Sequence, residues 1–349
     1  MTAILFDGFD HRDAIDRWTN ITGSSYQTSI VRTGSTSFTP SAGNSDLALY
    51  LDLSSTDDDD GITVGFGFYA VGGFEQQLLS FVDRVTGVCH VSLRFMGASR
   101  GWQLRRGGDG LPYAFSAVLA DTEPNIAIIG TWHYIEVKVK IADASGTVEL
   151  RQDGVTRLSY TGDTQNGGVA NVDRVAWASR TNGLDYRIDD IYILNEQGTI
   201  NNDFLGDTRC YPLYPNGNGN YSQLVGSDGN STDNYLLVDE SPVPSSSDYV
   251  GSATVGQKDT YTFEDLPVSV GTIRGVETRV FAAKTDTGTK QIRALVRRSA
   301  TDANGVDHAL ADSAYVTFQD MWEQDPHAGP GAWTITNVNG SEFGAEVRT

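Results

Sequence analysis

The chain has few of the residues that build disulfide frameworks, metal sites and membrane spans. Its 349 residues include 2 cysteines, 3 methionines and 5 histidines, and no apolar run approaches the length of a transmembrane helix. Lys and Arg total 25 against 45 Asp and Glu, which gives a formal net charge of −20. Because nucleic acids and anionic lipids are held mainly by Lys and Arg, we expect no direct contact with nucleic acid and no membrane insertion.

The cysteines and histidines predict neither a disulfide nor a zinc site. Cys89 and Cys210 fall on opposite sides of the domain boundary placed below, so two free thiols are expected. The beginning of the chain lacks the basic and apolar segments of a secretory leader, so we expect it to fold in a cytoplasm. We expect no cofactor and no metal, since the histidines show no paired spacing typical of zinc ligands. They are His11, His90, His133, His308 and His327.

Two neighbouring segments in the middle of the chain have the alternation of β-strands. In residues 132–141 (WHYIEVKVKI), one parity is mainly aliphatic and the other is polar or aromatic. Residues 146–155 (GTVELRQDGV) repeat this alternation, and the pair Asp153 and Gly154 is typical of a hairpin turn. With 38 glycines and 10% aromatic residues, these patterns predict an all-β protein.

The length and the strand pattern predict two domains, because single cores stop growing near roughly 250–300 residues. Residues 195–203 are polar and turn-rich, so we place the boundary there. We expect a large β-sandwich over residues 1–198 and a smaller β-sandwich or jelly roll over residues 199–349. The strands expected in the first domain are residues 46–53, 62–69, 77–83, 89–96, 102–105, 126–129, 132–141, 147–151, 155–160, 172–178 and 186–194.

The second domain is expected to contain strands separated by long loops. Residues 273–283 and 292–297 are expected to form a hairpin. Residues 214–222 and 226–234 are rich in Gly and Asn, which predicts surface loops. Further strands are expected at residues 208–214, 235–239, 259–263, 314–319 and 333–338, and one helical turn is expected at residues 13–18 of the first domain.

Clusters of acidic residues raise the question of a calcium site. Four consecutive aspartates at residues 57–60 lack the spaced pattern of a calcium loop, so a solvated turn is favoured. Asp189 and Asp190 begin the last strand of the first domain. If the two ends of that domain pair, Asp7, Asp10 and Asp185 become possible neighbours, and a cation there is possible.

No constellation in the sequence is typical of catalysis. The Glu-x-Asp-x-x-Glu signature of sandwich glycanases is absent, and so is a Gly-x-Ser-x-Gly elbow. Glu136 and Glu149 are followed by Lys or Arg on their own face, so both are expected in cross-strand ion pairs. On these grounds we expect a protein without enzymatic activity. Four aromatic residues could either form a sugar-stacking platform or pack in the core, and packing in the core is favoured. They are Trp102, Trp132, Trp177 and Tyr186.

The first domain resembles the concanavalin A-like, or laminin G-like, sandwich superfamily as it occurs in structural proteins of tailed phages. The second half resembles the module that accompanies this sandwich in phages and gene-transfer-agent-like particles. The first resemblance rests on FDGFD at residues 6–10 with Trp18, GTWHYIE at 130–136, VELRQDG at 148–154 and IDDIYI at 188–193. The second rests on VDESP at residues 238–242, DYV at 248–250, Asp325 with Pro326, and WTITNVNGSEFGAEV at 333–347.

This resemblance implies a non-enzymatic virion structural protein, as a head decoration, a head spike or a tail-attached component. Its partners would be other capsid or tail proteins, and particle symmetry implies a homo-oligomer, with a trimer preferred. A host-surface glycan is a further possible partner, contacted through Tyr214 and Tyr221 in the loops that follow the first domain. The alternative is a glycan-binding or glycan-degrading enzyme on a concanavalin A-like sandwich.

Overall fold

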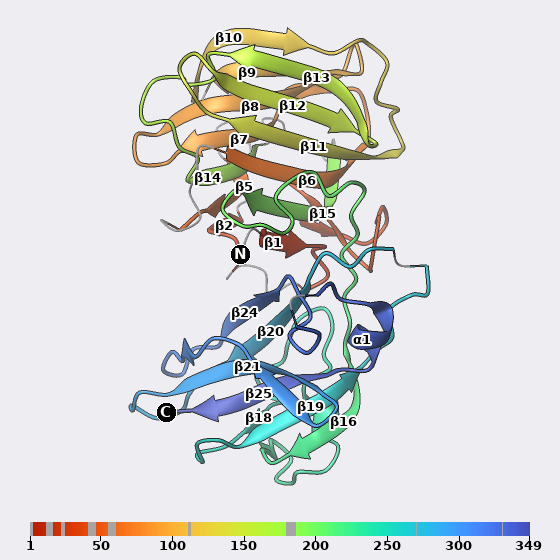
Figure 1. Cartoon of the computed structure of the whole chain (residues 1–349), viewed down its shortest axis with the longest axis vertical. Coiled ribbons are helices and arrows are strands. Elements are labelled where there is room, and N and C mark those ends of the chain that lie inside the picture. Colours follow the sequence, from red (N-terminus) through yellow and green to blue (C-terminus); the bar gives the residue numbers. More distant parts are fainter. Residues whose placement is uncertain are drawn as a thin grey trace. The chain divides into compact units, whose positions relative to one another are not determined.

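The computed structural model describes residues 3–11, 17–21, 25–40, 47–54, 61–110, 113–178, 186–269, 271–329 and 331–349 (Figure 1). The chain forms two compact units. One comprises Met1–Asp10 with Arg17–Cys210, and the other comprises His11–Asp16 with Tyr211–Thr349. The all-β prediction is confirmed, since nearly all regular structure is strand. Within the described ranges, no helix is long and apolar enough to cross a membrane.

The first unit is a sandwich of two antiparallel sheets, which have eight and seven strands among the described residues (Figure 1). We name them sheet A and sheet B. In spatial order, sheet A consists of β13 (Val155–Gly162), β12 (Gly146–Gln152), β11 (Trp132–Lys140), β6 (Gly61–Ala70), β15 (Tyr186–Asn195), β4 (Ser37–Thr39) and β3 (Ser25–Gln27), with β1 (Ala3–Asp7) also paired to β15. Sheet B consists of β10 (Tyr113–Asp121), β9 (Gly101–Gly110), β8 (Val88–Met96), β7 (Glu75–Asp83), β14 (Arg174–Ala178), β5 (Leu47–Asp52) and β2 (Asn20–Ile21).

The expected strand pair in the middle of the chain is confirmed. β11 and β12 are antiparallel neighbours in sheet A. At the turn into β13, both Asp153 and Gly154 have positive φ, 54° and 75°. A two-residue hairpin with positive φ at both central positions favours this Asp-Gly pair. Some segments depart from the prediction. Residues 126–129 form a loop, and the strands β1 and β10 and the short strands β2, β3 and β4 had not been expected.

Aromatic rings fill the space between sheets A and B. Phe66 and Phe68 of β6 point inward from sheet A. Trp102 lies 5.0 Å from Phe68, and Trp177 lies 5.8 Å from Phe66, in each case between ring centroids. Tyr186 lies 6.0 Å from Phe68. The preference for core packing over sugar stacking is therefore confirmed for Trp102, Trp177 and Tyr186, which are almost fully buried.

Residues 199–210 belong to the first unit, so this unit extends past the boundary expected at residue 198. We call these residues the strap. The backbone N–H of Gly206 donates to the buried carboxylate of Glu136 (2.8 Å), and that of Cys210 donates to Asp190 (2.8 Å). The expectation that the two cysteines lie in different domains was wrong, because these hydrogen bonds hold Cys210 to the first unit. Both thiols are free, as predicted.

The second unit is a smaller β-structure built around a six-stranded sheet, counted over the described residues. The sheet consists of β16 (Pro215–Ser222), β19 (Lys258–Phe263), β25 (Glu342–Arg348), β21 (Gln291–Arg298) and β22 (Thr301–Asn304), with β23 (His308–Ala309) also on β21. The remaining elements are the pairs β17 (Val225–Gly226) with β18 (Val250–Gly251) and β20 (Val276–Ala282) with β24 (Val316–Trp322), the 3₁₀ helix η2 (Asn234–Leu237) and the helix α1 (Ile335–Asn339).

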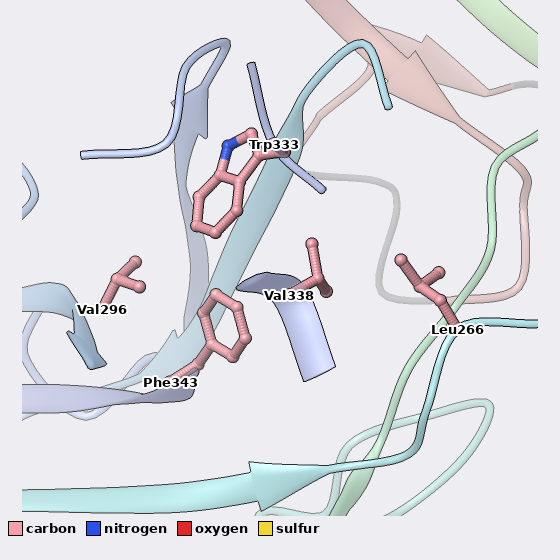
Figure 2. Packing of buried hydrophobic residues seen from close by; sticks show 5 residues of the cluster. All are labelled: Leu266, Val296, Trp333, Val338 and Phe343. Carbon is pink, nitrogen blue, oxygen red and sulfur yellow. The ribbon is translucent and has the colours of Figure 1, made fainter. Parts of the chain in front are cut away.

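The core of the second unit lies between the six-stranded sheet and the β20–β24 pair. Val296 of β21 and Phe343 of β25 contribute from the sheet, and Trp333 and Val338 from the segment around α1 (Figure 2). Partly buried residues of β20 and β24 pack against this cluster, among them Trp322. Two layers that enclose one apolar cluster make this unit a sandwich.

Several expectations for the second unit were wrong. Residues 333–338 are not a strand, because Thr334 caps α1 by accepting the N–H of Asn337 (3.1 Å). The segments 273–283 and 292–297 do not pair with each other, since β20 pairs with β24 and β21 pairs with β25. Residues 235–239 include η2, and residues 208–214 contain no strand.

The Gly- and Asn-rich segment at residues 214–222 contains the edge strand β16 and is not simply a loop. A Cβ atom on Gly219 would lie 2.4 Å from the carboxylate of Glu342, and one on Gly217 would lie 2.8 Å from the hydroxyl of Thr262. The glycines therefore permit close approach between strands, which is their usual reason to occur inside a sheet.

Candidate functional site: the outer face of sheet B

The outward surface of sheet B carries a set of polar side chains from neighbouring strands. The core rings fix which residues point outward. Phe95 and Trp102 are direct partners across β8 and β9 and point into the core, so the next pair, Arg94 and Gln103, points outward. By the same alternation, Ser92 and its partner Arg105 face outward.

The strand register arranges these residues in two rows. One row runs across β7, β8, β9 and β10 and comprises Gln77, Arg94, Gln103 and Asp121. The other runs across β5, β14, β7, β8 and β9 and comprises Tyr50, Ala176, Ser80, Ser92 and Arg105. Directly opposed side chains lie about 5 Å apart at their Cβ atoms, so the members of each row are direct neighbours on the sheet.

Hydrogen bonds orient the side chains of the first row. The Gln103 amide donates to Asp121 (2.8 Å) and accepts from Nε of Arg105 (2.5 Å). Gln77 donates to the hydroxyl of Ser80 (2.5 Å). A guanidinium nitrogen of Arg94 lies 3.2 Å from the carboxylate of Glu75, which is about half exposed. The donors and acceptors of this face are therefore positioned before any ligand arrives.

Small side chains form the middle of the face, and an aromatic ring lies toward one edge. Ser80, Ser92 and Ala176 are fully buried, and Gln77 and Gln103 are only 4% and 8% exposed. The guanidinium of Arg174 lies 4.0 Å from the ring centroid of Tyr50 and forms two hydrogen bonds to Asp52 (2.5 and 3.0 Å). Amide, hydroxyl, guanidinium and aromatic groups around small residues can bind the hydroxyl groups and ring faces of a sugar.

Four of the candidate cation ligands lie in one region of the first unit, because β1 pairs with β15 as the prediction required. Their contacts are mostly protein donors. Asp190 accepts from Arg32 (2.5 Å) and Thr33 (2.8 Å), while Asp7 accepts from the Trp18 indole (2.8 Å). No group of three or more His, Cys, Asp or Glu suited to a metal occurs among the described residues. Asp185 and residues 57–60, together with part of the helical turn expected at residues 13–18, lie outside the described residues.

Burial and mutual repulsion perturb these carboxyl groups. Burial and the charge of Asp190 raise the pKa of Asp189 to about 9, although N–H donors from Arg32, Thr33 and Asp190 act in the opposite direction. Burial also raises the pKa of Asp10, whose carboxylate accepts from Ser35 and Thr36. We therefore assign this cluster a structural role in joining the ends of the unit.

The two tyrosines predicted to contact a glycan are both engaged within the second unit. Tyr214 is half-buried, and its ring lies 5.2 Å from that of His11. The ring of Tyr221 lies between two cations, 5.2 Å from Lys258 and 4.5 Å from Arg297, and its hydroxyl donates to Asp302 (3.2 Å). They lie at opposite ends of β16, so they do not form one stacking surface.

The two glutamates predicted to form ion pairs differ. Glu149 forms an ion pair at 2.8 Å, but its partner Arg151 lies on the same strand, whereas a cross-strand pair was expected. Glu136 instead is buried and accepts from the hydroxyl of Tyr192 (2.5 Å) and from the backbone N–H of Gly206 (2.8 Å). Its expected ion pair was wrong because the strap covers this part of sheet A.

Sequence reasoning missed Gln77, Arg94, Gln103 and Arg105 as candidate ligand contacts. The signal was present in the alternation around them, since Leu93, Phe95, Trp102 and Leu104 occupy the inward parity. It could not be used alone, because strand alternation does not show which polar residues of separate strands meet in one row.

Comparison with protein-family models finds no match, and comparison with curated proteins finds none either. Among solved structures, an endo-β-1,4-glucuronan lyase from Trichoderma reesei is similar at 12% identity and a TM-score of 0.38, covering 55% of this chain and 94% of the lyase. A Bacillus subtilis protein of unknown function with a galectin-like fold has 13% identity and a TM-score of 0.40, with 56% and 98% of the chains covered. The alginate lyase Aly36B has 11% identity and a TM-score of 0.37, with 54% and 92% covered.

These similarities are to sandwich folds that include polysaccharide lyases, and they contradict the expectation that the chain is not an enzyme. That expectation rested on the absence of one glycanase signature and one serine motif. The absence of those motifs excludes only the chemistries that use them. The first unit is a sandwich of two antiparallel sheets, and the outer face of sheet B carries a row of polar side chains held by hydrogen bonds.

Proposed function

We propose that the first unit binds an extended carbohydrate chain across the outer face of sheet B. The observation that carries this proposal is the row of Gln77, Arg94, Gln103 and Asp121 on four adjacent strands. The amides and the guanidinium donate hydrogen bonds, and the carboxylate accepts them, so together they match the alternating hydroxyl groups of a sugar. Glycan binding thereby replaces the virion structural role as the main function that we assign to this chain.

The size of the face favours a polymer over a single sugar. Tyr50 on β5 and Arg105 on β9 are separated by four strand spacings, or about 19 Å at about 4.8 Å per strand. Tyr50 offers a ring surface at one side, and the polar row lies toward the other. A ligand several rings long would engage both.

The test is a panel of bacterial and algal polysaccharides, with binding measured by calorimetry on the full chain. Gln103→Ala and Arg94→Ala should each weaken binding about tenfold or more, because each removes a side chain that donates hydrogen bonds to the ligand. The matched control is Arg151→Ala, which changes an arginine on the outer face of sheet A. Equal affinity for all three variants and the unmodified chain would refute the assigned face.

Cleavage of the same polymer is the second candidate function. It is favoured by the position of Arg94 between two amides, since a guanidinium with flanking donors can stabilise negative charge that develops on a substrate carboxylate or oxygen. New reducing ends, or the ultraviolet absorbance of an unsaturated sugar, would reveal cleavage. Binding without either product would show that the chain binds the polymer but does not cleave it.

Placement on a virion stays a prediction that rests on the resemblance of the sequence to phage structural proteins. Self-association as a trimer stays a prediction as well. Imaging of purified particles at a resolution that resolves strands would test both, because the chain would then be traced at a site of known symmetry.

A further inference from the structure

An apolar surface lies at one end of the first unit, where the connections β6–β7 and β10–β11 meet. We call it the apolar end. It consists of three exposed aliphatic side chains, Val71 (43% exposed), Ile128 (57%) and Ile129 (37%), beside the half-buried rings of Tyr69 and Trp132. These two rings lie 5.4 Å apart. Apolar side chains gathered in one place are typical of an interaction site, whereas single exposed ones are common everywhere.

The loop that presents Ile128 and Ile129 is fixed to its surroundings. Its backbone is tied to three other segments of the unit, to the β8–β9 turn, to the end of β6 and to side chains of β11 and β12. The hydrogen bonds are Asn125 N to Ser99 O (2.7 Å), Ala127 N to Arg100 O (3.1 Å), Gly130 N to Ala70 O (2.9 Å), Ile128 N to His133 Nε2 (2.8 Å) and Gln152 Nε2 to Ile126 O (2.6 Å).

A second layer of hydrogen bonds holds those anchoring side chains. Because Nε2 of His133 accepts from Ile128, Nδ1 carries the proton and donates to Asp153 (2.7 Å). Gln152 also accepts from the buried indole of Trp102 (2.9 Å). The aliphatic side chains are thus held outward by a rigid support, so little conformational entropy is lost when a partner covers them.

The charges around the apolar end are balanced. Arg100 and Arg157 lie on its rim with Glu123 and Asp153, and Arg157 pairs with Glu123 at 3.2 Å. The whole chain carries a formal net charge of −20, so two copies repel each other over most of their surfaces. A rim with two positive and two negative groups around an apolar centre removes that repulsion locally.

We propose that the apolar end is the contact between two copies of this chain. In a two-fold contact the rim of one molecule faces the same rim of the other molecule. Positive groups of one rim can then meet negative groups of the other across the interface. Aliphatic side chains offer no hydrogen bonds to a sugar, which distinguishes this surface from the outer face of sheet B. The apolar end has far fewer residues than the roughly 20–30 per partner of a standard interface, so we expect weak association, with a dissociation constant on the order of micromolar.

The experiment is sedimentation equilibrium of the full chain over a wide concentration range. The unmodified chain should dimerise. Ile128→Asp should raise the dissociation constant about tenfold or more, because two added carboxylates would be buried in the symmetric contact. Val71→Asp changes a different connection of the same surface and should act in the same way.

The matched control is Val85→Asp, which adds the same charge at an exposed valine in the turn at the other end of β7. It should leave the dissociation constant within about twofold, and thermal unfolding should show that all variants are folded. The proposal is overturned if the unmodified chain stays monomeric at about 1 mM, or if Ile128→Asp and Val71→Asp associate as the control does. A higher oligomer that is insensitive to these changes would overturn it too.

Discussion

At the scale of single residues, the first unit depends on buried polar groups that hydrogen-bond to partners far away in the sequence. Glu136 and Tyr192 show how this works. The Tyr192 ring lies over Gly65, where a Cβ atom would come within 2.1 Å of the ring, and its hydroxyl reaches Glu136. Glycine at residue 65 is therefore needed for close approach, even though it weakens a strand by itself.

Replacing Glu136 with alanine should destabilise the protein by about 2–4 kcal/mol, since the buried hydroxyl of Tyr192 and the N–H of Gly206 would lose their acceptor. Urea unfolding measures the loss. Glu149→Ala is the matched control on the neighbouring strand, and loss of its half-exposed ion pair should cost about 1 kcal/mol or less. Similar losses for the two variants would show that the strap does not depend on Glu136.

At the scale of elements, the strap covers part of sheet A although it has no regular secondary structure. Its residues are held by partners that lie far away in the sequence. Arg32 donates to the carbonyl of Thr208 (2.8 Å) and pairs with Asp207, while the guanidinium of Arg151 lies 3.9 Å from the Phe204 ring. The turn-rich composition of residues 195–203 correctly indicated an irregular segment but not the unit to which it belongs.

Hydrogen exchange followed by mass spectrometry tests this attachment. A peptide covering residues 204–210 should exchange about 100-fold more slowly than one covering residues 227–233, because its amides are donors to buried acceptors. The second peptide is the control, since its side chains are almost all exposed. Equal exchange rates would mean that the strap opens freely, and the first unit would then end near residue 198.

At the scale of the whole molecule, both units contain carboxyl groups whose pKa values are shifted from their ordinary range. In the second unit, partial burial acts to raise the pKa of Asp302, but hydrogen bonds from Lys258 and Arg297 outweigh it and lower that pKa. Hydrogen bonds from Arg293 likewise lower the pKa of Glu346 against the effect of burial. In the first unit, burial raises the pKa of Asp189 to about 9.

Calorimetry as a function of pH tests these groups, and the contributions of Asp302 and Asp189 to stability should change with pH in opposite directions. A lowered folded pKa contributes stability above the unfolded pKa of about 4, so the second unit should lose stability as the pH falls below about 4. A raised folded pKa contributes stability at low pH, so the contribution of Asp189 should decline as the pH rises from about 4 toward 9. Asp302→Asn should flatten the acid trend of the second unit. An unchanged acid trend in Asp302→Asn would contradict the assignment for the second unit.

The sequence by itself determined the all-β class, the strands with strict alternation and the hairpin at Asp153 and Gly154, because these depend on local periodicity and on turn geometry. It also indicated the inward positions of Trp102 and Trp177. Where local signals were weak they misled, as with β16, whose glycines resemble a loop, and α1, whose start depends on one capping threonine.

Only the tertiary structure decided which polar residues meet. Gln77, Arg94 and Gln103 lie on three strands, and their common row depends on a register that no single strand encodes. The same holds for Glu136, whose partners come from β15 and from the strap, and for Ile128, whose exposure depends on a loop anchored to three other segments. Strand patterns are local, whereas the outer face of sheet B, the strap and the apolar end are made by contacts between residues far apart in the chain.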